Sequence, residues 1–304
     1  MIFIEEGIFS EDQMSLLRRQ FNKKNSNCSE VDYFIVGHKT KLSEDFFKSF
    51  KSKTSKILSL TTGITHIDNE VWLNPDRKIE TLKNPLFKDF LESTHSTSEL
   101  ALYHIYALIR AIAKIKRTPN VHIYLENRPK GRELSALNCG IIGYGRIGSR
   151  VAAYLAEMCL EVFFYDTADK SKQQNIATPL DSIEELVEQS EVIILATNYQ
   201  IESGPVLDES FFRQINEPKY IINISRGELV DFYQLECALR SGLVLGYASD
   251  VFLQENSNSI NDYERLFDMQ QEGYNISLTP HIGGNTVDAH NKLFSIANKF
   301  LKDF

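Results

Sequence analysis

The sequence predicts an α/β fold built on a doubly wound parallel sheet, and three observations predict it. An apolar run over residues 140–142 leads directly into a glycine-rich turn, residues 143–148, and then into an amphipathic stretch over residues 149–159. A second apolar run, residues 161–165, ends at Asp166. From residue 137 onward, short apolar runs alternate with helical patterns, which is the order that produces a parallel sheet with helices on its faces.

In a dinucleotide-binding fold, each of the three glycines of this turn has a different structural role. Gly143 permits the tight turn, Gly145 lets the backbone approach a pyrophosphate, and Gly148 lets helix and strand pack closely. The free N–H groups at the start of the helix face the phosphates. Asp166 follows at the distance of roughly 20 residues at which an acid binds the adenosine ribose, so it favours NAD over NADP. A structural glycine turn is the alternative, but strand, helix and acid together argue against it.

Length, charge and cysteine content limit the classes of protein. With 304 residues, the chain suffices for about two domains: we expect residues 1–95 and 286–304 to form a substrate domain and residues 96–285 an NAD-binding domain. A formal charge of −8 with mixed signs argues against nucleic acid or an anionic membrane as a partner. Neither a signal peptide nor a membrane span is expected. The four scattered cysteines have no metal-ligand spacing, so we expect no metal and reduced thiols in the cytoplasm.

The first block contains a candidate ligand loop. Residues 31–36 and 57–60 are expected strands, and the segment Thr61–Asp68 follows the second of them. A small polar loop after a strand is where open α/β folds bind ligands, and its N–H groups could hold a carboxylate. A plain connecting loop is the other interpretation of this stretch.

Residues 96–116 give the longest helical pattern. Its apolar residues recur at spacings of three and four, so they lie on one face. Such a helix before a dinucleotide fold is expected to connect two domains, or to use its apolar face in a dimer. The apolar residues are Ala101, Ile105, Leu108, Ile112 and Ile115.

Polar residues follow the expected strands of the second block. These strands cover residues 191–196, 220–224, 243–248 and 276–278. Open α/β sheets bind ligands outside the carboxyl ends of their strands. The residues at or near those ends are Thr197, Arg226, Asp250 and His281.

Three residues have the chemistry for hydride transfer to a 2-keto acid. Arg226 can grip a carboxylate and polarise the keto oxygen, and His281 can exchange a proton near neutral pH. Glu255 can orient the imidazole and stabilise its charged form. Each residue alone has a simpler interpretation as a surface or structural residue. Their shared placement near strand ends beside a nucleotide site favours the catalytic one.

Five segments carry a resemblance to a known family: residues 61–68, 131–148, 222–231, 250–255 and 279–286. Together they resemble the D-isomer-specific 2-hydroxyacid dehydrogenases, a family that includes D-lactate, glycerate and 3-phosphoglycerate dehydrogenases. The resemblance implies a Rossmann NAD-binding domain, a smaller flavodoxin-like α/β substrate domain and a homodimer formed through the NAD-binding domain.

The resemblance also implies roles for single residues. Arg226 would anchor the substrate, Glu255 would orient the histidine, and His281 would be the acid/base. Backbone groups of Thr62 and Gly63 would hold the substrate carboxylate. Asp250 would contact the nicotinamide amide, and Arg146 with Ile147 the pyrophosphate. The full set expected to contact NAD is Gly143, Gly145, Arg146, Ile147, Gly148, Asp166, Thr197, Ser225, Asp250 and Gly283.

The chain departs from the family pattern in three places. Thr197-Asn198-Tyr199 stands where the family usually has Pro-Leu-Thr, and Asn256 where it usually has Pro. Residues 69–90 do not follow the family pattern. Residues 60–85 show no cluster of cations for a phosphate, because Arg77 and Lys83, the two candidates, are expected on the surface. Trp72 is expected to be packed. Substrate choice is expected to lie in residues 1–95.

The sequence thus predicts an NAD-dependent oxidoreductase that acts on a small 2-keto or 2-hydroxy acid of D configuration. The alternative is a corepressor or sensor of the same fold that binds NAD(H) without significant turnover. A formate dehydrogenase is disfavoured, because those enzymes pair the histidine with Gln where Glu255 stands.

Overall fold

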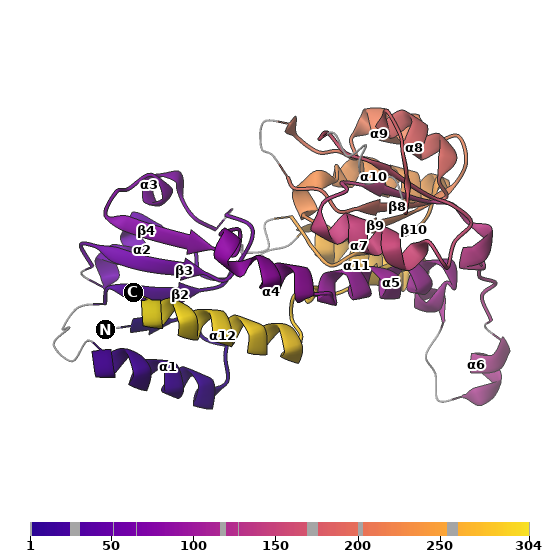
Figure 1. The fold of residues 1–304 in the computed structure, drawn as a ribbon. Coiled ribbons are helices and arrows are strands. Elements are labelled where there is room, and N and C mark those ends of the chain that lie inside the picture. The colour runs from indigo at the N-terminus through magenta and orange to yellow at the C-terminus, as the bar shows by residue number, and fades with distance from the viewer. Residues whose placement is uncertain are drawn as a thin grey trace. The chain divides into compact units, whose positions relative to one another are not determined.

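Both ends of the chain contribute to the first of two units (Figure 1). This unit comprises Met1–Thr94 and Asn285–Phe304, and the second unit comprises His95–Gly284. The structure is a computed structural model, and the residues that it describes are 2–24, 31–50, 52–64, 66–115, 120–126, 128–168, 176–199, 203–253 and 261–303.

The first unit contains a parallel sheet that is buried on both faces. Its described strands pair in the order β1-β2-β3-β4. Successive side chains of a strand point to opposite faces, so Phe34 and Ile57 pack in one apolar cluster while Ile35 and Leu58 pack in another. The strands are β1 (Ile2–Ile4), β2 (Tyr33–Val36), β3 (Ser55–Ser59) and β4 (Arg77–Thr81).

Helices from both chain ends cover one face of this sheet. Helices α1 (Glu11–Lys24) and α12 (Val287–Asp303) lie side by side and bury Leu17 and Phe300 against Ile35 and Leu58. The opposite face packs against Phe47 and Val71, which belong to α2 and α3. The remaining helices of this unit are α2 (Glu44–Ser49), α3 (Asn69–Trp72), α4 (Lys88–Ser93) and the 3₁₀ turn η1 (Pro85–Phe87).

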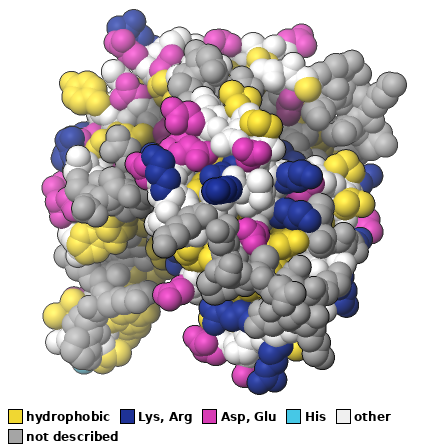
Figure 2. All heavy atoms as spheres, turned by 90° about the vertical axis from the view of Figure 1, so that its left-hand side faces the viewer, with side chains coloured by type: hydrophobic (Ala, Val, Ile, Leu, Met, Phe, Trp, Pro, Cys, Tyr) yellow, Lys and Arg dark blue, Asp and Glu magenta, His cyan; other side chains and the backbone are white. Residues whose placement is uncertain are grey.

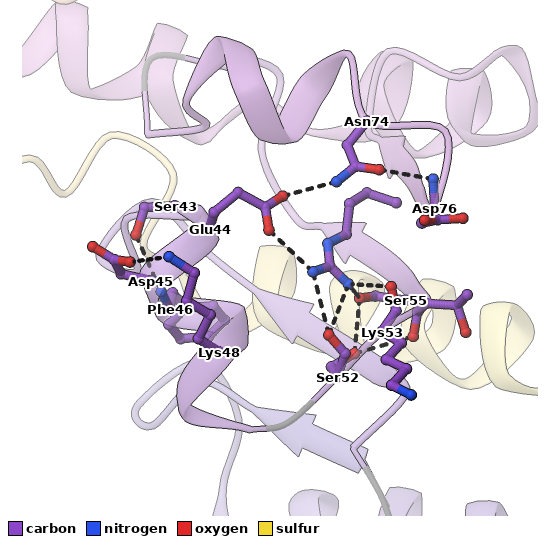
Figure 3. Close-up of polar contacts among 12 residues, drawn as sticks. Ser43, Glu44, Asp45, Phe46, Lys48, Ser52, Lys53, Ser55, Asn74 and Asp76 are labelled. Carbon is purple, nitrogen blue, oxygen red and sulfur yellow. Dashed lines mark hydrogen bonds and ion pairs between the residues drawn. The ribbon is translucent and has the colours of Figure 1, made fainter.

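The position predicted for Arg77 is wrong, because this cation is buried and held by several partners. Figure 3 labels these partners, which are Glu44, Ser52, Lys53 and Ser55. Its Nη2 lies 3.3 Å from Oε2 of Glu44. Its Nη1 donates to the Ser55 hydroxyl at 2.7 Å and to the carbonyl oxygens of Lys53 at 3.1 Å and Ser52 at 3.3 Å. The guanidinium therefore ties the start of β3 to the start of β4 and to α2.

Other features of the first unit also differ from the sequence prediction. Trp72 was expected to be packed, but 41% of it is exposed. Lys83 is exposed, as predicted. Elements β1, α1 and β4 were not predicted. The two strands lie at the edges of the sheet. Strand β4 has a polar sequence and so lacks the apolar signal of a central strand, and β1 is apolar but only three residues long, shorter than the runs that predict a strand.

The second unit confirms the predicted doubly wound sheet. Its described strands are all parallel, in the order β11-β10-β9-β8-β5-β6-β7. Strand β5 pairs with β6 on one side and β8 on the other, so the winding direction reverses there. The strands are β5 (Cys139–Ile142), β6 (Val162–Tyr165), β7 (Thr178–Pro179), β8 (Val192–Leu195), β9 (Lys219–Asn223), β10 (Val244–Ser249) and β11 (Ile276–Leu278).

Two separate apolar clusters lie on the two faces of this sheet. Helices α5 and α7 contribute to one cluster, and α8, α9, α10 and α11 contribute to the other. The helices are α5 (Ser96–Ile109), α6 (Val121–Glu126), α7 (Arg146–Leu155), α8 (Ile183–Gln189), α9 (Glu209–Arg213), α10 (Phe232–Ser241) and α11 (Asn261–Gln271), with 3₁₀ turns η2 (Ile112–Lys114), η3 (Leu134–Ala136) and η6 (Gly227–Leu229).

Two helices have bounds that differ from the prediction. Helix α5 ends at Ile109 instead of continuing to residue 116, because Ala111 takes a left-handed conformation with φ 49° and Arg132 N–H donates to the Ile109 carbonyl at 2.7 Å. Helix α7 begins at Arg146, directly after Gly145. The helix therefore starts inside the glycine turn.

The surface of the described residues carries side chains of both charges. On the face shown in Figure 2, cationic and anionic side chains are interspersed. None of the described helices combines the length and apolar character that crossing a membrane requires.

Candidate cofactor site and active site

The glycine turn follows β5 and is tightly packed at two of its three glycines. A Cβ on Gly148 would lie 2.0 Å from the Gly143 carbonyl oxygen, and a Cβ on Gly143 would lie 2.7 Å from the Thr197 backbone. Gly143 also has φ 98°, a conformation that glycine adopts readily. A Cβ on Gly145 would meet nothing within 4 Å. Gly145 thus leaves open space at the start of α7.

The start of α7 favours an anion. The first N–H groups of an α-helix are not used in hydrogen bonds within that helix, and the start of α7, at Arg146 and Ile147, carries the positive end of the helix dipole. Burial, and then the neighbouring Arg150, lower the pKa of Arg146. Two cationic side chains on the first turns add to the positive potential. A pyrophosphate fits this position, with Gly145 offering no side chain to obstruct it.

Asp166 follows β6 and accepts a hydrogen bond from the glycine turn that follows β5. Its Oδ2 accepts a hydrogen bond from the Tyr144 N–H at 2.7 Å, and its Oδ1 accepts one from Ala168 N–H at 2.8 Å. The Tyr144 ring stacks on Phe164 with centroids 3.7 Å apart. Each carboxylate oxygen has a further lone pair, so Asp166 can hold the turn and still accept from a ribose hydroxyl.

Arg226 follows β9 in a turn that Asn223 shapes. The buried Asn223 side chain donates to the Arg226 carbonyl at 2.8 Å and accepts from the Ser225 N–H at 3.0 Å. The Ser225 hydroxyl contacts the Thr197 carbonyl, which ties this turn to the end of β8. Arg226 Nη1 donates to the Ser225 carbonyl at 2.6 Å. The arginine is therefore presented by a rigid turn at the carboxyl edge of the sheet.

The segment that follows β11 is organised by Asp250. The carboxylate is buried and accepts from the Thr279 hydroxyl at 2.6 Å, from Ile282 N–H at 2.8 Å and from Gly283 N–H at 2.7 Å. Desolvation raises the pKa of Asp250, although these hydrogen bonds oppose the rise. His281, inside this segment, has φ 52°. Asp250 thus holds the turn that carries His281.

The divergent segment after β8 is partly packed. Asn198 is exposed, whereas Tyr199 packs against the apolar cluster beneath α8 to α11. Thr197 is half-buried and lies against Gly143. The departure from Pro-Leu-Thr therefore leaves the contact between β8 and the glycine turn in place.

The candidate substrate loop lies in the first unit, after β3. The Ser59 hydroxyl lies 3.0 Å from Nε2 of His66 and 2.9 Å from the hydroxyl of Thr61. Thr61 in turn donates to the Gly63 carbonyl at 2.7 Å. Ser59 and His66 are buried, whereas Thr62 and Gly63 are half-exposed. Buried hydroxyl and imidazole groups thus fix the shape of the loop beneath its exposed residues.

The second unit brings most of the predicted site residues to the carboxyl edge of one sheet. They follow β5, β6, β8, β9, β10 and β11 in turn. Glu255 and Asn256 lie outside the described residues, so the role of Glu255 stays a prediction. Sequence reasoning assigned no role to Asn223, Ser59, His66 or His104. A polar residue inside an apolar strand, or on the apolar face of α5, is the signal that would have found Asn223 and His104.

The fold and the glycine turn define an NAD-binding domain, and comparison with known proteins identifies its family. Residues 102–283 match the model of the D-isomer specific 2-hydroxyacid dehydrogenase NAD-binding domain. The chain belongs to this family, which confirms the predicted family and cofactor.

Curated relatives include two D-3-phosphoglycerate dehydrogenases. The chain is 32% identical to that of Haemophilus influenzae over 219 residues, which is 72% of this chain and 52% of the relative. It is 30% identical to that of Dictyostelium discoideum over 209 residues, 69% of this chain and 50% of the relative. The chain spans about half the length of these relatives.

Solved structures share the fold over the whole chain. D-lactate dehydrogenase of Aquifex aeolicus, crystallised with NAD and lactic acid, has a TM-score of 0.81 and is 21% identical in sequence. The match spans 100% of this chain and 94% of that chain. D-2-hydroxyisocaproate dehydrogenase has a TM-score of 0.78 and is 19% identical, and the match spans 100% of this chain and 96% of that chain. At these identities the likeness shows the fold alone.

Proposed function

We propose that this chain is an NAD-dependent D-2-hydroxyacid dehydrogenase that transfers a hydride between nicotinamide and a small 2-keto or 2-hydroxy acid. One observation carries the proposal: Arg226 and His281 follow two strands of the same sheet, at the edge where the glycine turn favours a dinucleotide. Membership of the family supports it.

The reduction divides into a hydride and a proton. NADH supplies the hydride to the keto carbon when it is bound. Arg226 binds the substrate carboxylate and polarises the keto oxygen, and His281 gives that oxygen its proton. Glu255 orients the imidazole, and the backbone of Thr62 and Gly63 in the first unit, the substrate domain of this proposal, holds the carboxylate. In the reverse direction His281 accepts the proton.

The cofactor contacts come from the second unit. Gly145, Arg146 and Ile147 hold the pyrophosphate, and Asp166 accepts from the ribose hydroxyls and repels a 2′-phosphate. Gly143 and Gly148 make the turn possible. The remaining contacts that we propose, on the nicotinamide side, are Thr197, Ser225, Asp250 and Gly283.

Whether the 2-keto acid substrate is phosphorylated can be tested with a panel of candidate substrates. Curated relatives carry the name D-3-phosphoglycerate dehydrogenase and a structural neighbour that of D-lactate dehydrogenase. Of the two cations considered for a phosphate, Arg77 is committed to Glu44 and the start of β3, and Lys83 is exposed. The panel therefore needs both phosphorylated and unphosphorylated acids.

The test is to mix the purified chain with NADH or NADPH and 2-keto acids: glyoxylate, pyruvate, hydroxypyruvate, phosphohydroxypyruvate and branched or aromatic examples. We expect loss of nicotinamide absorbance with at least one acid, faster with NADH. His281→Gln should still bind NADH but lose at least about 10²-fold in turnover, the scale for removal of a general acid. The exposed His95, directly before α5, provides a matched control, His95→Gln.

Two outcomes would contradict the proposal. Near-normal turnover by His281→Gln would remove His281 from the chemistry. Tight NADH binding without oxidation by any acid would favour the sensor or corepressor role instead.

We also propose a cytoplasmic homodimer that forms through the second unit. Every side chain of α6 is exposed, including Val121, Ile123, Tyr124 and Leu125, and this helix lies away from the sheet of its own unit (Figure 1). A second copy would cover such a surface. The free thiols of Cys139, Cys159 and Cys237 support a reducing compartment.

A further inference from the structure

A buried histidine of α5 contacts the segment that carries His281. His104 is 0% exposed. Its Nδ1 lies 3.1 Å from the hydroxyl oxygen of Ser277, in β11, and its Nε2 lies 3.0 Å from that of Thr279. Burial lowers the pKa of His104 to about 4. The imidazole is therefore neutral at pH 7, with one nitrogen that donates and one that accepts.

The partners of Thr279 determine which nitrogen carries the proton. Thr279 donates its only hydroxyl proton to Oδ1 of Asp250 at 2.6 Å, and that carboxylate also accepts two backbone N–H bonds. The Thr279 oxygen must then accept from Nε2–H of His104, and Nδ1 must accept from the Ser277 hydroxyl. All hydrogen bonds in this chain point the same way, from Ser277 through His104 and Thr279 to Asp250.

Asp250, at the end of this hydrogen-bonded chain, fixes the backbone directly after His281. It holds Ile282 N–H at 2.8 Å and Gly283 N–H at 2.7 Å, directly after His281. His281 itself has φ 52°, which costs a residue with a side chain about 1–2 kcal/mol. Such a conformation persists only where the surroundings impose it. The three hydrogen bonds to Asp250 supply that constraint.

A purely apolar role does not explain a histidine at position 104. The neighbours on the same face of α5, Ala101, Ile105 and Leu108, are fully buried apolar residues, and a leucine would extend that face without a polar group to satisfy. A buried imidazole is stable only with both nitrogens paired, and here both are paired to the β11 segment.

We propose that His104 is a positioning residue for His281: it fixes the hydroxyl of Thr279, which fixes Asp250, which holds the left-handed turn of the acid/base. The inference deepens the proposed function and rests on it through the role of His281. His104 touches neither substrate nor cofactor in this scheme. The pyrophosphate and ribose contacts that we propose at the glycine turn and Asp166 do not involve His104, so its effect appears mainly in the rate of proton transfer and less in the affinity for NADH.

The experiment compares variants that break the chain with variants that keep it. His104→Leu and Thr279→Val remove the link, whereas Gln at position 104 keeps a donor near the place of Nε2. We expect His104→Leu to lower kcat at least about tenfold, the effect of a small misplacement of a reacting group. The Kd for NADH, from fluorescence, should change less than about threefold, and Thr279→Val should match. The double variant should lose little more, because both changes break one chain.

Two further variants and one NMR measurement separate positioning from packing and from failure of the proposed function. Leu108→Ala, a cavity in the same helix, should lower Tm without lowering kcat, and His104→Gln should recover most of the kcat lost in His104→Leu. Histidine ¹⁵N NMR of the wild type should report the neutral Nε2–H tautomer at position 104, with or without turnover.

Three results would overturn the inference, and one would not. Wild-type kcat in His104→Leu, no recovery in His104→Gln, or the Nδ1–H tautomer would each overturn it. A wild type that reduces none of the acids while the Nε2–H tautomer is present would instead contradict the proposed function, and would leave the hydrogen-bonded chain standing.

Discussion

At the scale of single residues, charged and titratable groups take their roles from what surrounds them. The sequence predicts Arg77 on the surface, but the structure buries it. Its guanidinium joins β3, β4 and α2 through Glu44, the Ser55 hydroxyl and backbone oxygens. The sequence predicts Asp250 as a cofactor contact, and in the structure both of its oxygens also accept hydrogen bonds from residues 279–283 and so hold that segment. Guanidinium and carboxylate groups tolerate burial only with such partners.

The buried His104 gives a pH dependence of stability. Its pKa falls from 6.5 to about 4 on folding, so the unfolded chain binds this proton at a higher pH than the folded chain. Folded stability therefore falls as the pH drops from 6.5 towards 4. Between pH 7 and pH 5 we expect this group to lower the free energy of unfolding by about 2 kcal/mol.

Urea unfolding of wild type and His104→Gln at both pH values measures this effect. The wild type should lose about 2 kcal/mol more than the variant between pH 7 and pH 5. The raised pKa of Asp250 acts in the opposite direction, and it is common to both proteins. An equal pH dependence in the two proteins would show that His104 titrates normally in the folded state.

At the scale of elements, the glycine turn joins β5 to α7 by close backbone contact. Gly148 brings the first turn of α7 against the Gly143 carbonyl, and Gly143 brings the turn against Thr197 after β8. Packing thus fixes the direction of α7. Gly145, with open space around its Cβ position, serves no packing contact of that kind.

Two alanine substitutions should separate packing from cofactor binding. Gly148→Ala would place a methyl group 2.0 Å from a backbone oxygen, and we expect it to destabilise the protein by about 3 kcal/mol. Gly145→Ala has φ −80° and no clash, so its stability should change by less than about 1 kcal/mol. Its NADH affinity should fall at least about tenfold, because the methyl group obstructs the pyrophosphate.

Thermal unfolding and NADH fluorescence titration measure the two effects. Normal NADH affinity in Gly145→Ala would mean that the pyrophosphate does not approach this glycine. Normal stability in Gly148→Ala would mean that α7 can shift away from β5.

At the scale of the whole molecule, the family match covers the second unit, while the first unit is assembled from both chain ends. Helix α12 returns to pack beside α1. This division agrees with the proposal that the NAD-binding unit carries the shared chemistry and that residues 1–95 choose the acid. Helix α6, in the second unit, has every side chain exposed, and four of them are apolar.

The proposed dimer predicts a change of assembly when α6 is made acidic. Ile123→Glu combined with Leu125→Glu should convert a dimer to a monomer, since charged groups at the core of an interface oppose association. Sedimentation velocity measures the change. Leu73→Glu, at an exposed leucine of the first unit, is the control and should stay dimeric. A wild type that sediments as a monomer would refute the dimer.

The sequence alone determined the doubly wound sheet, the glycine turn and the acid at the end of β6. These features depend on residues close in the chain: a buried parallel strand needs a continuous apolar run, and a tight turn needs glycine. The same logic located Arg226 and His281 after strands, because the carboxyl ends of parallel strands share one edge. The role of Glu255 as the acidic partner stays a prediction, because this residue lies outside the described residues.

The tertiary structure decided where the polar groups find their partners. His104 meets Thr279, Arg77 meets Glu44, and Ser59 meets His66 through packing that no local pattern specifies. The edge strands β1 and β4 and the early end of α5 were also settled by distant contacts. The physical reason is that local sequence sets backbone preference, whereas the burial of a polar group is stable only once a remote segment supplies its hydrogen bonds.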